Sequence, residues 1–333
     1  MDWTQDAAHL LLWIIVVLQG LIQWSSFALA AEPVLPDVTV VCSIRLIEES
    51  PVQLQNVHIV DTTMNGNEGG FGSALTIHVH YGTYFRMGVL NISRSNLCKV
   101  KAKSSGGAIY LGINKALLHI TQSSKLENNI AGAYGIGKGG AVYTRYSISS
   151  LVVDGGSSIS NIVAGGFGGA FHVGGSSSSN VSILACSNIS WNFANNAGGE
   201  FSITEHYLVQ FLLSNNGRSV DNNMAAGHVI PTDPWGIFPV DYIIGGGALL
   251  HVHGPMDRLI LQYNSSMSNN SAVISGVTYI QDDVVDGIYI LEGSQIVNNV
   301  ATDRDFKRRL FQLDHQGPEQ YFGQCCPIRK WNK

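Results

Sequence analysis

The chain has 333 residues, of which 37 are glycine and only 13% are charged, and its formal net charge at pH 7 is −5. Average usage would give about 23 glycines, so this composition is unusual for an ordinary α/β domain. Lys and Arg are thinly spread and form no basic stripe, so nucleic acid is not an expected partner.

An apolar run at residues 10–24 opens the chain and is followed by Ala28-Leu29-Ala30, the small-x-small pattern at which signal peptidases cut. We therefore predict that residues 1–30 are a signal peptide and that the rest of the chain is secreted or lies at the cell surface. The alternative is an uncleaved anchor helix, the one case in which we expect the chain to contact a membrane. The run is shorter than the ~20 residues of a typical span, and no Lys or Arg precedes it.

One motif then repeats along the chain. It reads GGAIY at 106–110, GGAVY at 139–143 and GGAFH at 168–172, with weaker copies at 198–202 and 246–250. A period of this length indicates a solenoid, a propeller or an array. The segments between the glycines alternate at period two and are rich in β-branched and aromatic residues, which excludes helical repeats. They are also too short for a propeller blade. The sequence therefore predicts an all-β, right-handed parallel β-helix over residues 31–302.

A second motif places an apolar residue three positions before the latter of two adjacent asparagines. It occurs at 126–129, 193–196, 213–216, 220–223, 267–270 and 296–299. Asparagine tolerates left-handed backbone conformations, so each pair suits a tight corner at the end of a strand. Stacked on successive coils, the amides can bond to one another in a ladder.

Alignment of the copies on their glycines separates two faces of the following strand. The column that contains Ile109, Val142 and Phe171 is expected to face the core. Alternation places the other column, which consists of Tyr110, Tyr143 and His172, on the outside. The alanines of the motif, and Glu200 at the same position of a later copy, are expected on this outer face too. Stacked rings there can dock a sugar or a protein, or they can form aromatic pairs that only stabilise the sheet. Glu200 is expected to be a solvated carboxylate.

Residues 224–245 lengthen one repeat and hold three prolines, with Trp235 and Phe238 between them. This insertion must leave the coil, and long loops on rigid scaffolds often bind partners, so Trp235 and Phe238 are candidate contact residues. A loop that folds back over a sheet or an edge is the alternative. Residues 303–333 become strongly charged and are expected to form a C-terminal cap or tail.

No metal or cofactor is expected. His78 with His80, and His251 with His253, have a spacing that can bind a transition metal, but both pairs are predicted to point into solvent, too far apart to share one ion. Asp282, Asp283 and Asp286 are expected to form a solvated turn, and the five cysteines indicate no particular pairing. Asn-x-Ser sequons, which are possible glycosylation sites, begin at Asn91, Asn180, Asn188, Asn264 and Asn269.

The GGAIY, GGAVY and GGAFH copies, with the Phe193-x-x-Asn196 type of motif between them, resemble the repeats of chlamydial polymorphic outer-membrane proteins. The resemblance covers roughly residues 70–300. It implies a β-helix of the pectin-lyase-like superfamily and a surface or secreted protein of the adhesin type.

We therefore expect a non-enzymatic surface module that binds a cell-surface glycan or protein. A polysaccharide lyase or glycoside hydrolase is the alternative, because this fold often hosts such enzymes. No series of motifs like that of polygalacturonases is present, and Arg145 and Arg218 are the only cations between residues 139 and 257. No catalytic residue is assigned.

Overall fold

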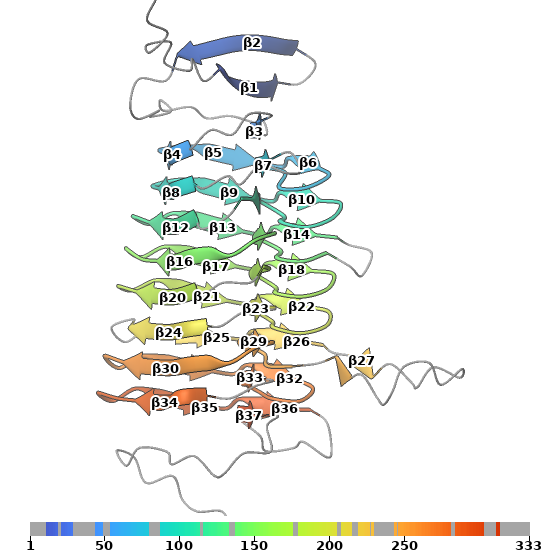
Figure 1. The fold of residues 1–333 in the computed structure, drawn as a ribbon. Coiled ribbons are helices and arrows are strands. Elements are labelled where there is room, and N and C mark those ends of the chain that lie inside the picture. The colour runs from blue at the N-terminus through green and yellow to red at the C-terminus, as the bar shows by residue number, and fades with distance from the viewer. Residues whose placement is uncertain are drawn as a thin grey trace, which may run out of the picture.

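The computed structural model describes fifteen stretches of the chain. These are residues 11–18, 21–28, 44–48, 54–79, 87–113, 116–132, 137–175, 179–204, 208–214, 219–226, 228–229, 243–244, 246–280, 284–302 and 311–313. Every regular element in these stretches is a β-strand, and the strands stack into a parallel β-helix (Figure 1). The predicted fold class is confirmed.

Four parallel sheets form the sides of the helix, and each coil passes through sheets I, II, III and IV in that order. Sheet I consists of β4 (Leu54–Val60), β8 (Met87–Ser93), β12 (Ala116–Thr121), β16 (Ile148–Val153), β20 (Ser179–Leu184), β24 (Leu208–Ser214), β30 (Met256–Gln262) and β34 (Val284–Ile290). Sheet II consists of β5 (Thr63–Asn65), β9 (Asn96–Cys98), β13 (Lys125–Glu127), β17 (Ser158–Ser160), β21 (Asn188–Ser190), β25 (Ser219–Asp221), β31 (Ser266–Ser268) and β35 (Gln295–Val297).

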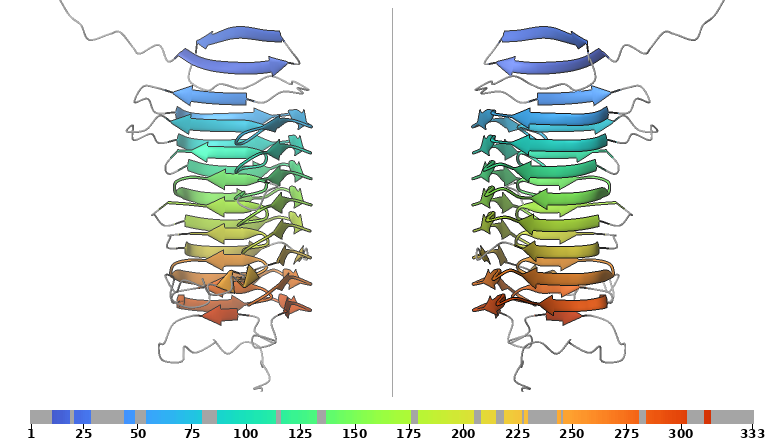
Figure 2. Two further views of the ribbon diagram at one scale, coloured as in Figure 1. Left: turned by 90° about the vertical axis from the view of Figure 1, so that its right-hand side faces the viewer. Right: turned by 90° about the vertical axis from the view of Figure 1, so that its left-hand side faces the viewer.

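Sheet III consists of β6 (Glu68–Gly69), β10 (Lys101–Ala102), β14 (Ile130–Ala131), β18 (Val163–Ala164), β22 (Phe193–Ala194), β26 (Met224–Ala225), β32 (Ser271–Ala272) and β36 (Val300–Ala301). Sheet IV consists of β3 (Ile44–Glu48), β7 (Leu75–Val79), β11 (Ile109–Gly112), β15 (Val142–Thr144), β19 (Phe171–Val173), β23 (Phe201–Ile203), β29 (Leu250–Val252), β33 (Thr278–Ile280) and β37 (Phe311–Leu313). Figure 2 shows the same stack from two sides.

Two antiparallel pairs lie outside these sheets. β1 (Leu11–Leu18) pairs with β2 (Leu21–Ala28), and both lie within the segment predicted to be a signal peptide. Cleavage of this segment stays a prediction. β27 (His228–Val229) pairs with β28 (Ile243–Ile244) at the two ends of the insertion. Met224 and Ala225, which the sequence assigned to the insertion, are a regular strand of sheet III, so the chain leaves the coil only after them.

The register of sheet IV follows the aligned repeats, because Ile109 pairs with Val142, Val142 with Phe171, and Phe171 with Phe201. These side chains are at most 1% exposed and belong to one continuous hydrophobic core, as predicted. Complete burial of a side chain of this size contributes roughly 1.5 to 3 kcal/mol. The core therefore depends on stacking, since no coil could bury its apolar side chains alone.

The glycine pairs of the repeat allow consecutive coils to approach each other at the entry to sheet IV. Gly168 has a φ of +64°, which L side chains rarely adopt. A Cβ atom at Gly169 would overlap the carbonyl oxygen of Gly199 on the next coil. Both positions of the pair are thus restricted to glycine, one by backbone conformation and one by space.

Asparagines form the predicted ladder at the corner between sheets II and III. The backbone N–H of Asn192 donates to Oδ1 of Asn223 at 3.0 Å, and the N–H of Asn223 donates to Oδ1 of Asn270 at 3.0 Å. The N–H of Asn270 donates in turn to Oδ1 of Asn299 at 2.9 Å. Asn223 and Asn270 are fully buried, so their side chains satisfy backbone donors that water cannot reach.

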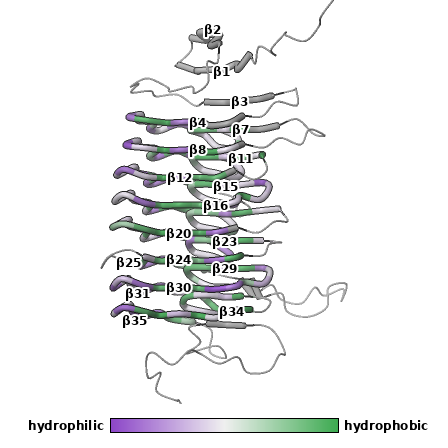
Figure 3. Tube along the Cα trace, turned by 60° about the vertical axis from the view of Figure 1, so that its left-hand side comes forward, coloured by the Kyte–Doolittle hydropathy of each residue, from purple (hydrophilic) through white to green (hydrophobic). Residues whose placement is uncertain are grey.

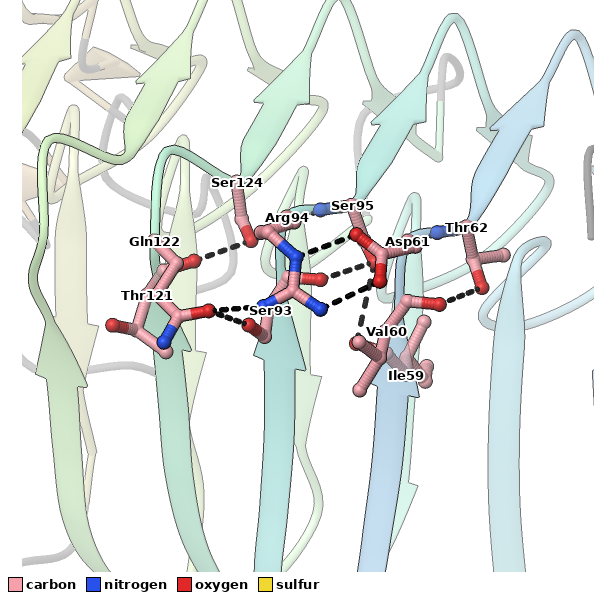
Figure 4. A network of polar contacts seen from close by, with 10 residues as sticks. All are labelled: Ile59, Val60, Asp61, Thr62, Ser93, Arg94, Ser95, Thr121, Gln122 and Ser124. Atoms are coloured by element: carbon pink, nitrogen blue, oxygen red, sulfur yellow. Dashed lines mark hydrogen bonds and ion pairs between the residues drawn. The ribbon is translucent and has the colours of Figure 1, made fainter. Parts of the chain in front are cut away.

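A second ladder, which the sequence analysis did not anticipate, lies at the corner between sheets I and II. The N–H of Thr62 donates to Oγ of Ser95 at 3.1 Å, and the N–H of Ser95 donates to Oγ of Ser124 at 3.2 Å (Figure 4). At the surface of this corner, Arg94 makes a two-bond ion pair with Asp61 at 2.6 Å. Figure 3 shows that hydrophilic residues gather at this edge while hydrophobic ones follow the strands.

Candidate functional site

The aromatic column predicted as a binding surface is present. Tyr110, Tyr143 and His172 lie on successive strands of sheet IV, and neighbouring ring centroids are 5.4 Å apart in both pairs. The predicted stacking is confirmed. The predicted exposure is wrong, because Tyr110 is 6% exposed and His172 is 1% exposed, and Tyr143 is only half-buried.

The connection from sheet III to sheet IV covers the column. The ring of Phe71 lies 5.0 Å from that of Tyr110, and the ring of Phe167 lies 6.3 Å from His172 and 6.5 Å from His251. Alternation assigned the column correctly to the side away from the core, but it did not reveal that the glycine turns fold back over that side. The rings therefore form a packed ladder in which each pair contributes about 0.5 to 1.5 kcal/mol. Tyr110 and His172 are too deeply buried to contact a sugar.

Glu200 is a second correction, since the predicted solvated carboxylate is fully buried. The alanines at the same position of the motif, Ala108, Ala141 and Ala170, are also buried in the core and not outside. The physical reason is that these residues precede their strands. β23 begins only at Phe201, and alternation of faces holds only within a strand.

Desolvation raises the pKa of Glu200 well above its ordinary value of 4.5, and the nearby negative charge of Asp221 raises it further. Its Oε2 accepts a hydrogen bond of 3.4 Å from Nδ2 of Asn223, in the asparagine ladder. Its Oε1 has no partner among the described residues. Glu200 thus lies inside the wall of the helix, where burial favours its protonated form.

The pair of His251 and His253 does not form the predicted solvated group. His251 is 8% exposed, and burial, with a smaller contribution from His253, lowers its pKa from 6.5 to about 3. His253 is half-buried, and the side chains of His78 and His80 lie outside the described residues. The described part of the chain contains no group of three metal-ligating side chains.

The structure describes only some of the remaining sequence candidates. Trp235 and Phe238 lie outside the described residues, as do Asp282 and Asp283. Asp286 is exposed and pairs with Nε of Arg258 at 3.2 Å. Among the sequons, Asn180, Asn264 and Asn269 are exposed, while Asn91 and Asn188 are half-buried.

The outer face of sheet III presents apolar side chains that sequence reasoning missed. Ile130, Val163, Phe193 and Met224 follow one another in register on four adjacent strands. Val163 is 36% exposed, Met224 is 44% exposed, and the other two are half-buried. Together they form a continuous apolar strip that runs along the helix axis.

Trp191 stands at the edge of this strip, at the corner between β21 and β22. It is 60% exposed and has a φ of +60°. The equivalent positions on neighbouring coils are Asn161 and Asn222, and their backbone N–H groups make the same contact to the next coil as that of Trp191. Left-handed backbone is common for asparagine, but for a residue as bulky as tryptophan it is a genuine outlier. We call Ile130, Val163, Trp191, Phe193 and Met224 the Trp191 surface.

No family model, curated protein or solved structure matches this chain. None of the described residues forms a helix long and apolar enough to cross a membrane.

Proposed function

We propose that this chain is a non-catalytic β-helix scaffold, secreted or held at the cell surface, that binds a partner through the Trp191 surface. The observation that carries the proposal is that Trp191, exposed and with left-handed backbone, stands at the edge of the apolar strip on sheet III. A left-handed backbone costs a residue with a side chain roughly 1 to 2 kcal/mol. Since asparagine occupies the same corner on neighbouring coils, the fold itself does not require tryptophan there.

Such local strain persists mainly where a side chain has a functional role. Burial does not provide one, because Trp191 is 60% exposed. Tryptophan is, in contrast, the side chain most often found at the energetic centre of binding interfaces. Its position is therefore better explained by a contact with another molecule than by the stability of the coil.

The strip on sheet III supports the same conclusion. Apolar side chains scattered singly over a surface need no explanation, but a contiguous patch marks an interaction site. Val163, Phe193 and Met224 are contiguous by strand register, and Phe193 is two residues from Trp191. The half-buried apolar side chains and the exposed indole can thus contact one partner together.

The proposed location rests on the apolar run at residues 10–24 and on the sequons, three of which have exposed asparagines. The repeat also resembles that of surface proteins of the polymorphic outer-membrane type. The alternative, a polysaccharide-active enzyme, needs carboxylates that a substrate can reach. Glu200, whose pKa is raised as that of a general acid would be, is buried beneath the coil surface.

Replacement of Trp191 by asparagine gives a direct test, because Trp191→Asn inserts the residue of the neighbouring coils and relieves the strain. Tyr263→Asn is the matched control. Tyr263 is also an exposed aromatic residue, 51% exposed with a φ of +57°, but it lies at the other corner, between sheets I and II.

Four probes cover the classes of partner: uncharged hexasaccharides, anionic hexasaccharides, phosphatidylcholine vesicles and self-association measured by sedimentation. We expect at least one response that the wild type and Tyr263→Asn share and that Trp191→Asn loses. If Trp191→Asn keeps every response of the wild type, or if the wild type shows none, the proposal is wrong.

A further inference from the structure

We infer that the ligand of the Trp191 surface is an uncharged glycan, held along a column formed by Asn128, Asn161, Trp191 and Asn222. This inference rests on the proposed function and adds the chemical class of the partner. The four residues occupy the same corner on four successive coils, and all have left-handed backbone, with φ between 55° and 60°.

Backbone hydrogen bonds fix the column. The N–H of Asn128 donates to the carbonyl of Ser160, that of Asn161 to Ser190, and that of Trp191 to Asp221. Because each corner residue makes the same bond to the next coil, the four side chains project from one edge at intervals of about 4.8 Å. This interval is close to the length of one sugar unit in an extended glycan, so consecutive sugars can meet consecutive corner residues.

The side chains have the chemistry that sugars require. Each asparagine amide offers two donors and an acceptor, which suits a pair of neighbouring hydroxyl groups. The side-chain amides of Asn128, Asn161 and Asn222 make no hydrogen bond to other described residues, so they are available to a ligand. The negative face of the Trp191 indole attracts the C–H groups on the apolar face of a sugar ring.

Charge favours an uncharged glycan over an anionic one. Two residues of the column follow directly after an acidic residue, since Glu127 precedes Asn128 and Asp221 precedes Asn222. Lys99 occupies the same corner one coil before Asn128, which places it three coils, or about 14 Å, from Trp191. A uronic acid bound at Trp191 would therefore lie nearer to Asp221 than to Lys99.

The apolar strip lies beside the column on sheet III, where it can contact the same glycan. Phe193 and Met224 are on the coil of Trp191 and on the next coil, one short turn after the corner. A lipid surface would also suit apolar side chains, but it would not explain three unpaired amides in line with the indole. A second copy of the chain and a vesicle surface are therefore alternative outcomes of the test.

The test is calorimetric titration of the purified chain with cellohexaose, chitohexaose and mannohexaose, and with hexagalacturonate as the anionic comparison. We expect at least one uncharged hexasaccharide to bind, and hexagalacturonate to bind more weakly or not at all. Trp191→Asn should weaken binding by at least about tenfold, and Asn161→Ala by about threefold or more. Tyr263→Asn should bind as the wild type does, and circular dichroism should show that all variants are folded.

Stronger binding of hexagalacturonate, or uncharged binding that Trp191→Asn does not weaken, would overturn the inference. If the Trp191-dependent response is instead to vesicles or is self-association, the glycan inference fails and the proposed function stands. If no probe gives a Trp191-dependent response, both fail.

Discussion

The buried carboxyl of Glu200 makes the stability of this β-helix depend on pH in a way that one substitution removes. In the unfolded chain this group ionises near its ordinary pKa of 4.5, whereas burial and Asp221 keep it protonated in the folded chain to higher pH. Above pH 4.5 the unfolded state therefore binds fewer protons than the folded state. The free energy of unfolding consequently falls as the pH rises toward the pKa of Glu200 in the folded chain. Within that window the loss is about 1.4 kcal/mol for each pH unit.

Glu200→Gln keeps the shape of the side chain and its acceptor for Asn223 but cannot ionise. The free energy of unfolding should be measured in urea at half-unit steps from pH 4 to 8 for both proteins. All other titrating groups are shared, so the difference between the two isolates Glu200. We expect the variant's advantage to grow from pH 4.5 upward by up to about 1.4 kcal/mol per unit. A difference that stays constant over this range would refute a protonated, buried Glu200.

Three further predictions follow from the packing. His251→Phe should make the free energy of unfolding less sensitive to acid. Because the folded pKa of His251 is about 3, the wild type loses up to about 1.4 kcal/mol of this free energy per pH unit as the pH falls below 6.5. Urea unfolding of both proteins at pH 4 to 7 checks this. Asn223→Ala should lower stability by about 2 to 4 kcal/mol, measured the same way, since it leaves Glu200 and a ladder N–H unpaired. Gly169→Ala should abolish the thermal transition in circular dichroism, while Gly70→Ala, where a Cβ meets nothing within 4 Å, should not.

The coil, its register and the asparagine corners could be predicted from the sequence because each leaves a repeated pattern. Paired glycines mark the entry to sheet IV, and the second residue after them begins the core-facing column. At the corner between sheets II and III, the first asparagine of a pair adopts left-handed backbone, as at Asn128 and Asn222, and the second enters the ladder. The predicted corner at Asn195 and Asn196 does not follow this rule, because Asn195 does not have a positive φ. At these corners the local backbone conformation and the stacking of neighbouring coils both favour the same residue type, glycine or asparagine.

The environment of the outer aromatic column could not be predicted in the same way. Alternation fixes the side of the sheet that Tyr110 and His172 face, but whether that side is open depends on the path of a turn that obeys no alternation. The same limit explains Glu200, which lies in that turn, one residue before the strand begins. Periodicity thus distinguishes the faces of a strand but not their exposure.

Trp191 was missed for a different reason. The repeats were aligned on the glycines and on paired asparagines, and neither pattern includes a tryptophan. Alignment on the buried residues of sheet II, such as Leu126, Ile159 and Ile189, would have placed Trp191 in a column otherwise filled by asparagine at neighbouring coils. The serine ladder was missed in the same way, because serine is too frequent in this chain for its spacing to attract notice.

Side-chain oxidation footprinting with mass spectrometry can show whether Trp191 contacts a partner. Hydroxyl radicals oxidise exposed tryptophan, tyrosine and methionine, so Trp191, Met224 and Tyr263 all report in one experiment. With the best-binding probe present, we expect slower oxidation of Trp191 and Met224 and no change at Tyr263. Equal oxidation of Trp191 with and without a bound probe would contradict it.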